Sequence, residues 1–192
     1  MGIAWQSPVT YDIKGNSLIQ FGEAGETQEP AETSIQVPQG IRSEVSVDAG
    51  ALLTFRPALI WNQWSIVESQ LATGSRTGEV LFRTPRKFED TLEIRLGTDI
   101  HLTGSQSLNL LLGYESGATP KDTYEPGLAE SNNARFGVGM TSQWNETLST
   151  HLSFVWQAFD NVTVTDSLQK PTTNGRYTDQ RQYLTLDMEV AL

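Results

Sequence analysis

His151 is the residue whose neighbours come nearest to a catalytic set. Ser149 and Ser153 flank it, and Asp187 follows on the last predicted strand. A serine, a histidine and a carboxylate are the groups of a hydrolytic triad, but a triad is defined by a geometry that spacing along the chain does not supply. The pattern leaves an ester hydrolase open as a minor alternative. It favours polar residues that line a lumen, and no catalytic residue is predicted.

Charged side chains on the predicted strands form two sets of opposite sign. The acidic set is Glu93, Asp99, Glu115, Asp187 and Glu189, and the basic set is Arg42, Arg56, Arg95 and Arg135. Unpaired charges are expensive in a narrow lumen, so an ion-pair network is favoured over a general acid–base pair.

One predicted outer loop carries Asp122, Glu125 and Glu130. These carboxylates are of the type that binds Ca²⁺ together with lipopolysaccharide, but the spacing of an EF-hand loop is missing. A solvated acidic loop is therefore favoured, and neither a metal site nor a cofactor is predicted.

Composition excludes several classes of function. The 192 residues carry a net charge of −10, which disfavours a nucleic-acid partner because phosphate binding needs clustered lysine and arginine. Cysteine is absent, which rules out disulfides and thiolate metal sites. No run of 18 apolar residues is present, so the sequence predicts no transmembrane helix.

Alternation of apolar and polar residues is the main structural signal. Within 90–102, Leu92, Ile94 and Leu96 fall on one face, while Glu93 and Arg95 fall on the other, because successive strand side chains point to opposite sides. Eight stretches alternate in this way: 2–13, 39–48, 52–63, 90–102, 107–115, 133–143, 148–158 and 182–192. Their apolar faces carry no Asp, Glu, Lys or Arg.

The links between these stretches alternate in length. Links of about four residues follow the second, fourth and sixth stretches, and links of about 17 to 26 residues follow the others. Short periplasmic turns and long extracellular loops are typical of an antiparallel, up-and-down transmembrane β-barrel. A soluble sandwich or a lipocalin-like barrel is the alternative. Pro57, inside the third stretch, predicts a bulge or a local kink because it removes a ladder donor.

Short motifs in order along the chain carry a family resemblance. They are Gly-Ile-Ala-Trp-Gln-Ser at 2–7 with Gly15, the strand after Pro38, Trp-Asn-Gln-Trp-Ser at 61–65, Phe-Glu-Asp-Thr at 88–91 with Gly97, Gly-Tyr-Glu-Ser at 113–116 with Pro120, and Arg135 with Gly137. Together they resemble the C-terminal half of a FadL-type outer-membrane transporter. The family takes up long-chain fatty acids and other hydrophobic compounds.

Departures from the family pattern bear on completeness. The family's acidic Pro-Asp-x-Asp is replaced by Glu-Ser-Asn-Asn at 130–133, and the final residue is Leu192 rather than an aromatic one. No signal peptide or plug segment precedes the first stretch. The family barrel has about fourteen strands. We therefore expect residues 1–192 to form one barrel segment, with the N-terminal half and plug missing.

The resemblance implies passive uptake of fatty acids or aromatic hydrocarbons across the bacterial outer membrane, without enzymatic activity. The alternative is a structural or adhesive barrel whose loops bind a partner. Expected partners are the hydrophobic solute, outer-membrane lipid and lipopolysaccharide, and the full-length protein is expected to be a monomer. A carboxylated solute benefits from an inward cation, for which Arg95 and Arg135 are the candidates. Further lumen-lining candidates are Glu93, Glu115, His151 and Tyr183.

Overall fold

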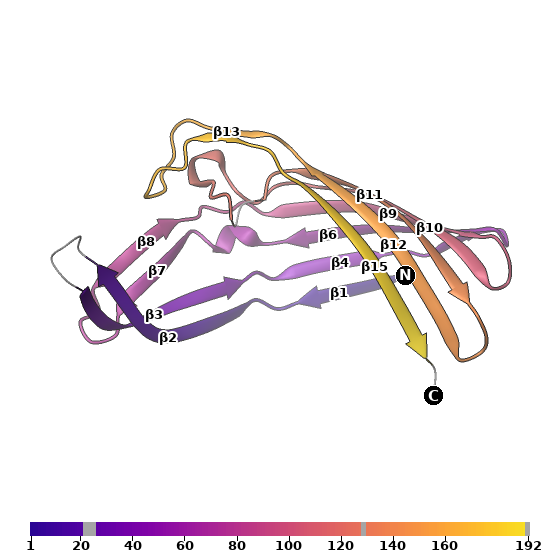
Figure 1. Ribbon diagram of the computed structural model, residues 1–192, viewed down its shortest axis with the longest axis horizontal. Coiled ribbons are helices and arrows are strands. Elements are labelled where there is room, and N and C mark those ends of the chain that lie inside the picture. The colour runs from indigo at the N-terminus through magenta and orange to yellow at the C-terminus, as the bar shows by residue number, and fades with distance from the viewer. Residues whose placement is uncertain (21–25, 128–129, 191–192) are drawn as a thin grey trace.

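The computed structural model describes residues 1–20, 26–127 and 130–190, and it is almost entirely antiparallel β-structure (Figure 1). No helix in these ranges has the length and apolar character needed to cross a membrane. The main sheet comprises β1 (Gly2–Gln6), β4 (Gly40–Glu44), β5 (Val47–Ala49), β6 (Leu53–Asn62), β9 (Thr91–His101), β10 (Gln106–Glu115), β11 (Asn133–Gln143), β12 (Leu148–Phe159) and β15 (Gln180–Val190).

Strands of the main sheet lie beside their neighbours in chain order. The order is β1-β4-β6-β9-β10-β11-β12-β15, with β5 paired to β6, and the strands form one long curved sheet (Figure 1). Every pairing is antiparallel. The predicted up-and-down arrangement is confirmed. Within the described residues, β1 and β15 are the two edges of this sheet.

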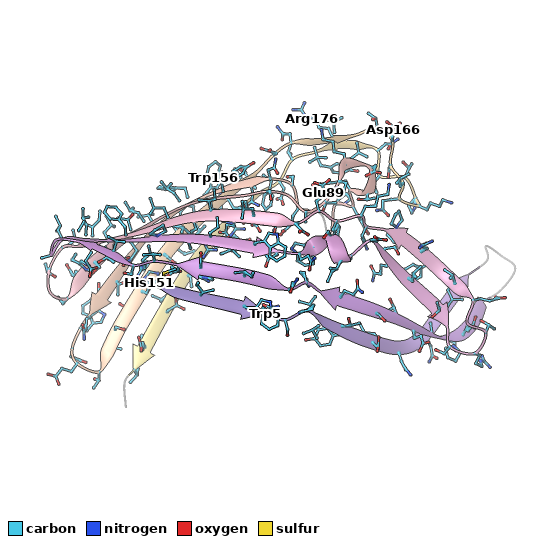
Figure 2. All side chains as sticks on the ribbon, turned by 180° about the vertical axis from the view of Figure 1, so that it is seen from behind. Trp5, Glu89, His151, Trp156, Asp166 and Arg176 are labelled. Atoms are coloured by element: carbon cyan, nitrogen blue, oxygen red, sulfur yellow. The ribbon has the colours of Figure 1, made fainter. Side chains whose placement is uncertain are left out.

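The apolar face of the sheet is the exposed one. On β9, Ile94 is 59% exposed, whereas Glu93 and Asp99 on the other face are 5% and 7% exposed. Trp156 and His151, both from β12, point to opposite sides of the sheet (Figure 2). Burial of charge beneath an exposed apolar surface reverses the pattern of a soluble protein. It is the arrangement expected where the outer face meets lipid and the inner face lines a lumen.

Two predicted loops contain a second sheet. The first predicted strand, 2–13, continues through β2 (Val9–Gln20), which returns along β3 (Glu26–Val37), and the loop predicted for 64–89 contains β7 (Ser69–Gly74) and β8 (Val80–Pro85). These four strands pair in the order β2-β3-β7-β8, here called the extension sheet. Polar cross-strand pairs such as Asp12 with Ser34, at 2.6 Å, hold it together. The Gly-rich stretch at 22–25 lies outside the described residues.

Pro57 does not form a bulge in its strand, so the predicted bulge was wrong. β6 pairs with β9 in unbroken register across Pro57, and the interruption falls on the other neighbour, between Glu44 and Val47, where the predicted strand 39–48 divides into β4 and β5. The Val45 amide donates to the Pro57 carbonyl at 3.1 Å. Pro57 has no N–H to return to Val45, so this ladder breaks while its register is kept.

The remaining long connections pack together as a loop cluster, defined as residues 85–90, 118–125 and 162–177. It contains the short 3₁₀ turn η2 (Lys121–Thr123) and the hairpin of β13 (Val162–Val164) and β14 (Gly175–Tyr177). A small core of Tyr124, Val162 and Val164 packs against Tyr177. Figure 2 labels Glu89, Asp166 and Arg176 around this cluster, at the end of the main sheet opposite the short turns.

Candidate functional site

Four of the predicted site residues meet on the inner face of the sheet. Glu93 accepts from Arg95 Nη2 at 2.7 Å and from Arg135 Nη1 at 3.2 Å. Arg135 also binds Glu115. The four side chains, here called the upper network, carry no net charge together. The side chain of Glu93 is only 6% exposed, so both of its partners are needed to offset its desolvation.

Strand register explains why these four residues meet. Glu93 lies opposite Glu115, and Gly113 lies between Arg95 and Arg135 on the neighbouring strands. A Cβ at Gly113 would stand 3.8 Å from the Glu93 carboxylate oxygen. That is an ordinary contact distance, so the strand register itself lets Arg135 reach across β10 to Glu93 on β9.

The predicted cations Arg95 and Arg135 are therefore already bound to carboxylates of the chain. These contacts belong to the ion-pair network that the charge sets predict. Neither guanidinium is fully covered, since their side chains are 28% and 24% exposed. A role in binding a carboxylated solute stays a prediction for both.

A second chain of hydrogen bonds, the lower network, lies nearer the short turns. Arg56 binds Asp99 at 2.6 Å, and Asn109 donates to the same carboxylate at 2.7 Å. Thr141 donates to the Asn109 side-chain oxygen at 2.9 Å and contacts His151 Nδ1 at 2.9 Å. Because the Thr141 proton is given to Asn109, His151 Nδ1 must be the donor to Thr141.

The serine, histidine and aspartate noted in the sequence do not form a hydrogen-bonded triad within the described residues. Asp187 lies opposite His151 in the strand register, but His151 Nδ1 is engaged by Thr141. A triad requires that nitrogen to face the carboxylate.

Tyr183 also lies apart from both networks. It stands opposite Val155 on the edge strand β15 and is 46% exposed. Of the six predicted site residues, four therefore gather in the upper network, His151 belongs to the lower one, and Tyr183 joins neither.

The acidic loop residues are ion-paired. Lys87 binds Asp122 at 2.9 Å, Arg86 binds Glu125 at 2.5 Å, and Arg181 lies 3.7 Å from Glu130. Among the described residues, no group of three or more His, Asp or Glu side chains is placed to hold a metal ion.

A groove of about 470 Å³ on the inner face is lined by Arg95 of the upper network and by residues of the lower network, including Asp99 and His151. Its floor follows one cross-strand row of small and apolar residues, which includes Gly97, Leu111, Gly137 and Val155. Arg42, Arg56 and Arg95 line it from the side. The lumen wall therefore combines an apolar strip with polar borders.

Sequence reasoning missed a larger groove of about 870 Å³, here called the mouth groove. It lies beneath the extension sheet and beside the short 3₁₀ turn η1 (Trp64–Ile66). Its apolar lining is Ile35, Trp64, Val67, Leu71 and Phe88, and its charged lining is Asp12, Lys14, Glu32 and Arg86. In the sequence, Trp64 and Phe88 stand out only as members of short motifs. They lie outside the eight alternating stretches, so the pattern that predicts lipid-facing strands does not indicate a groove there.

An aromatic pair forms one wall of the mouth groove. The Trp64 and Phe88 rings stand edge to face, with centroids 6.0 Å apart and planes at 84°. The Phe88 amide donates to the Val67 carbonyl at 3.2 Å, and the Asp90 carboxylate accepts from the Ser65 amide at 3.0 Å. Both rings are thus held by backbone segments that bond to each other.

Comparison with solved structures finds the same fold in three of them. A Pseudomonas aeruginosa FadL homologue superposes with a TM-score of 0.76 at 14% identity, over 97% of this chain and 46% of that one. The CymD monoaromatic hydrocarbon channel superposes with a TM-score of 0.62 at 11% identity, over 98% of this chain and 46% of that one. The Ralstonia pickettii toluene transporter TbuX superposes with a TM-score of 0.59 at 10% identity, over 98% of this chain and 43% of that one. This chain spans less than half the length of each.

Sequence comparison gives the family directly. No curated protein sequence matches the chain significantly. Residues 1–190 match the model of the family described as outer membrane protein transport protein (OMPP1/FadL/TodX). The chain therefore belongs to the OMPP1/FadL/TodX family and is a bacterial outer-membrane β-barrel protein.

Proposed function

We propose that this chain serves passive, non-enzymatic uptake of hydrophobic small molecules, either long-chain fatty acids or aromatic hydrocarbons, across the outer membrane. The mouth groove is the observation that carries the proposal. It lies at the end of the sheet with the long connections, which in such barrels is the extracellular end. Its volume of about 870 Å³ falls in the range of small-molecule sites, which are mostly lined by apolar and aromatic groups.

The two inner networks fit passive transport. Their charged groups are bound to one another, and a charge held by a partner keeps a lumen wall stable without taking part in chemistry. Arg95, Arg135, Glu93, Glu115, His151 and Tyr183 keep the proposed role of lumen-lining residues.

The proposal includes the setting of the chain. Residues 1–192 are one segment of a barrel of about fourteen strands, whose other half and plug are supplied outside these residues. Two observations support this: the chain covers 43% to 46% of the three solved structures, and β1 and β15 are edges within the described residues. The outer face meets lipid and lipopolysaccharide, and the full-length protein acts as a monomer.

Uptake into liposomes tests the function. Labelled oleate or labelled toluene is added to the medium outside vesicles that carry the full-length protein. The rate of solute entry is compared with the rate for vesicles without protein. We expect faster entry of at least one solute, and slower entry with the W64A variant. W144A, altered at the opposite end of the sheet, is the matched control.

Two results would contradict the proposal. Entry no faster than into empty vesicles would favour a structural or adhesive barrel. Hydrolysis of a nitrophenyl ester that is lost in H151A would favour an enzyme.

A further inference from the structure

We infer that the mouth groove binds uncharged aromatic molecules and rejects carboxylates, so that the chain selects hydrocarbons over fatty acids at its extracellular entrance. The inference rests on the proposed function for its biological meaning, but binding at the groove can be measured without transport.

The aromatic wall gives the preference for rings. Trp64 and Phe88 stand edge to face at 6.0 Å, and Leu71 and Val67 line the same space. A third ring placed against this pair gains edge-to-face contacts, each typically worth a factor of about two to ten in affinity beyond the area buried. Since backbone hydrogen bonds hold the segments that carry both rings, little ordering is needed when a ligand binds.

Arg86, the buried cation among the described residues that line the groove, is already engaged. The Arg86 side chain is 8% exposed and binds the Glu125 carboxylate. Its second terminal nitrogen donates to the Gln70 side-chain oxygen at 2.9 Å. A carboxylate ligand that took the position of Glu125 on Nη1 would have to displace it, and breaking such a pair is costly.

With Arg86 neutralised by Glu125, the other charged residues that line the groove sum to −1. Among the described lining residues, Asp12 and Glu32 are carboxylates, and Lys14 is the one cation besides Arg86. Lys14 is 77% exposed and lies 3.8 Å from Glu32, so it is a weak, solvent-screened pair. A bound carboxylate would thus face two like charges against one hydrated ammonium group, and like charges in close proximity disfavour ionised groups.

Naphthalene and 2-naphthoate form a matched pair of probes, since they differ only in the carboxylate. Binding is measured at pH 7.5 on the full-length protein in lipid nanodiscs, which avoids detergent in the groove. We expect naphthalene to bind on the order of tenfold more tightly than naphthoate. The W64A and F88L variants should each lose affinity for naphthalene by about two- to tenfold.

Charge variants test whether the groove repels the carboxylate of naphthoate or only fails to attract it. The double variant D12N and E32Q removes both carboxylates and frees Lys14, so naphthoate should bind several-fold more tightly while naphthalene binding is unchanged. E146Q, in the turn between β11 and β12, is the control that removes a distant carboxylate. Resistance of each variant to heat denaturation before electrophoresis confirms that it is folded.

Naphthoate binding as tight as naphthalene, or unchanged discrimination in the double variant, would overturn the inference. Naphthalene binding that is indifferent to W64A and F88L would do the same. Failure of the proposed function is distinguishable, because the groove would still discriminate between the two probes while neither oleate nor toluene entered vesicles.

Discussion

Neutralising Glu93 should cost more stability than neutralising any exposed carboxylate of the lumen wall. Its side chain is 6% exposed and binds Arg95 at 2.7 Å and Arg135 at 3.2 Å. Removing one partner of a buried ion pair costs about 3–5 kcal/mol. Arg95 is 28% exposed and Arg135 keeps Glu115, so E93Q should fall near the lower end of that range, at about 3 kcal/mol.

Glu44 offers the matched control. It binds Arg42 at 2.8 Å, but the two side chains are 37% and 50% exposed, and exposed pairs are typically worth about 0–1 kcal/mol. Both variants are compared by urea unfolding of the full-length protein in lipid vesicles, followed by tryptophan fluorescence.

The reasoning also fixes a coupling between Glu93 and Arg95. If their contact carries the cost, the double variant E93Q with R95Q should lose less than the sum of the two single variants. Equal losses for E93Q and E44Q, or additive losses in the double variant, would show that burial and pairing at Glu93 do not determine its contribution.

Three further changes test other parts of the structure. A Cβ at Gly137 would stand 3.0 Å from Leu111 Cβ, whereas one at Gly113 meets nothing closer than 3.7 Å; in urea unfolding G137A should lose about 1–3 kcal/mol and G113A less than about 0.5 kcal/mol. Burial raises the pKa of Tyr124. The stability that the neutral Tyr124 side chain gives to the loop cluster is therefore complete below the ordinary tyrosine pKa near 10 and is lost as pH rises further. Proteolysis of the loop cluster should increase at high pH, and should increase less in Y124F. Cysteines placed on β1 and β15 of the isolated chain should not form an efficient disulfide in a detergent-bound monomer, and efficient closure would show a complete eight-stranded barrel instead.

The sequence predicted the membrane strands well because the two faces of each strand meet different surroundings. Lipid excludes charge from one face and the lumen admits it on the other, so a stretch such as 133–143 shows its bounds plainly, and β11 spans those residues. The strand predicted at 182–192 begins two residues earlier, at Gln180, and residues 191–192 lie outside the described range. Pairing in chain order follows from short turns, which join antiparallel neighbours.

The extension sheet escaped prediction except for residues 9–13 of β2, which lie in the predicted stretch 2–13. Lys14 and Glu32 face each other on β2 and β3 and are exposed to solvent. Beyond residue 13 these strands carry few alternating apolar residues, so they resemble a polar loop in sequence. The mouth groove was missed for the same reason, since its walls come from two connections that the sequence shows only as long and polar.

The inner networks show which ion pairs can be predicted from residue type without the strand register. Charge sets alone predicted that carboxylates and guanidiniums would pair, and Arg135 does bind Glu93 and Glu115. Which partners meet depends on cross-strand alignment, where one residue of slip would turn every inward charge toward lipid. Register decides the outcome locally, because Gly113 lies between Arg95 and Arg135 on the neighbouring strands and Glu93 lies opposite Glu115. A lumen wall of this kind is therefore specified twice, by the alternation that selects its residues and by the register that joins them.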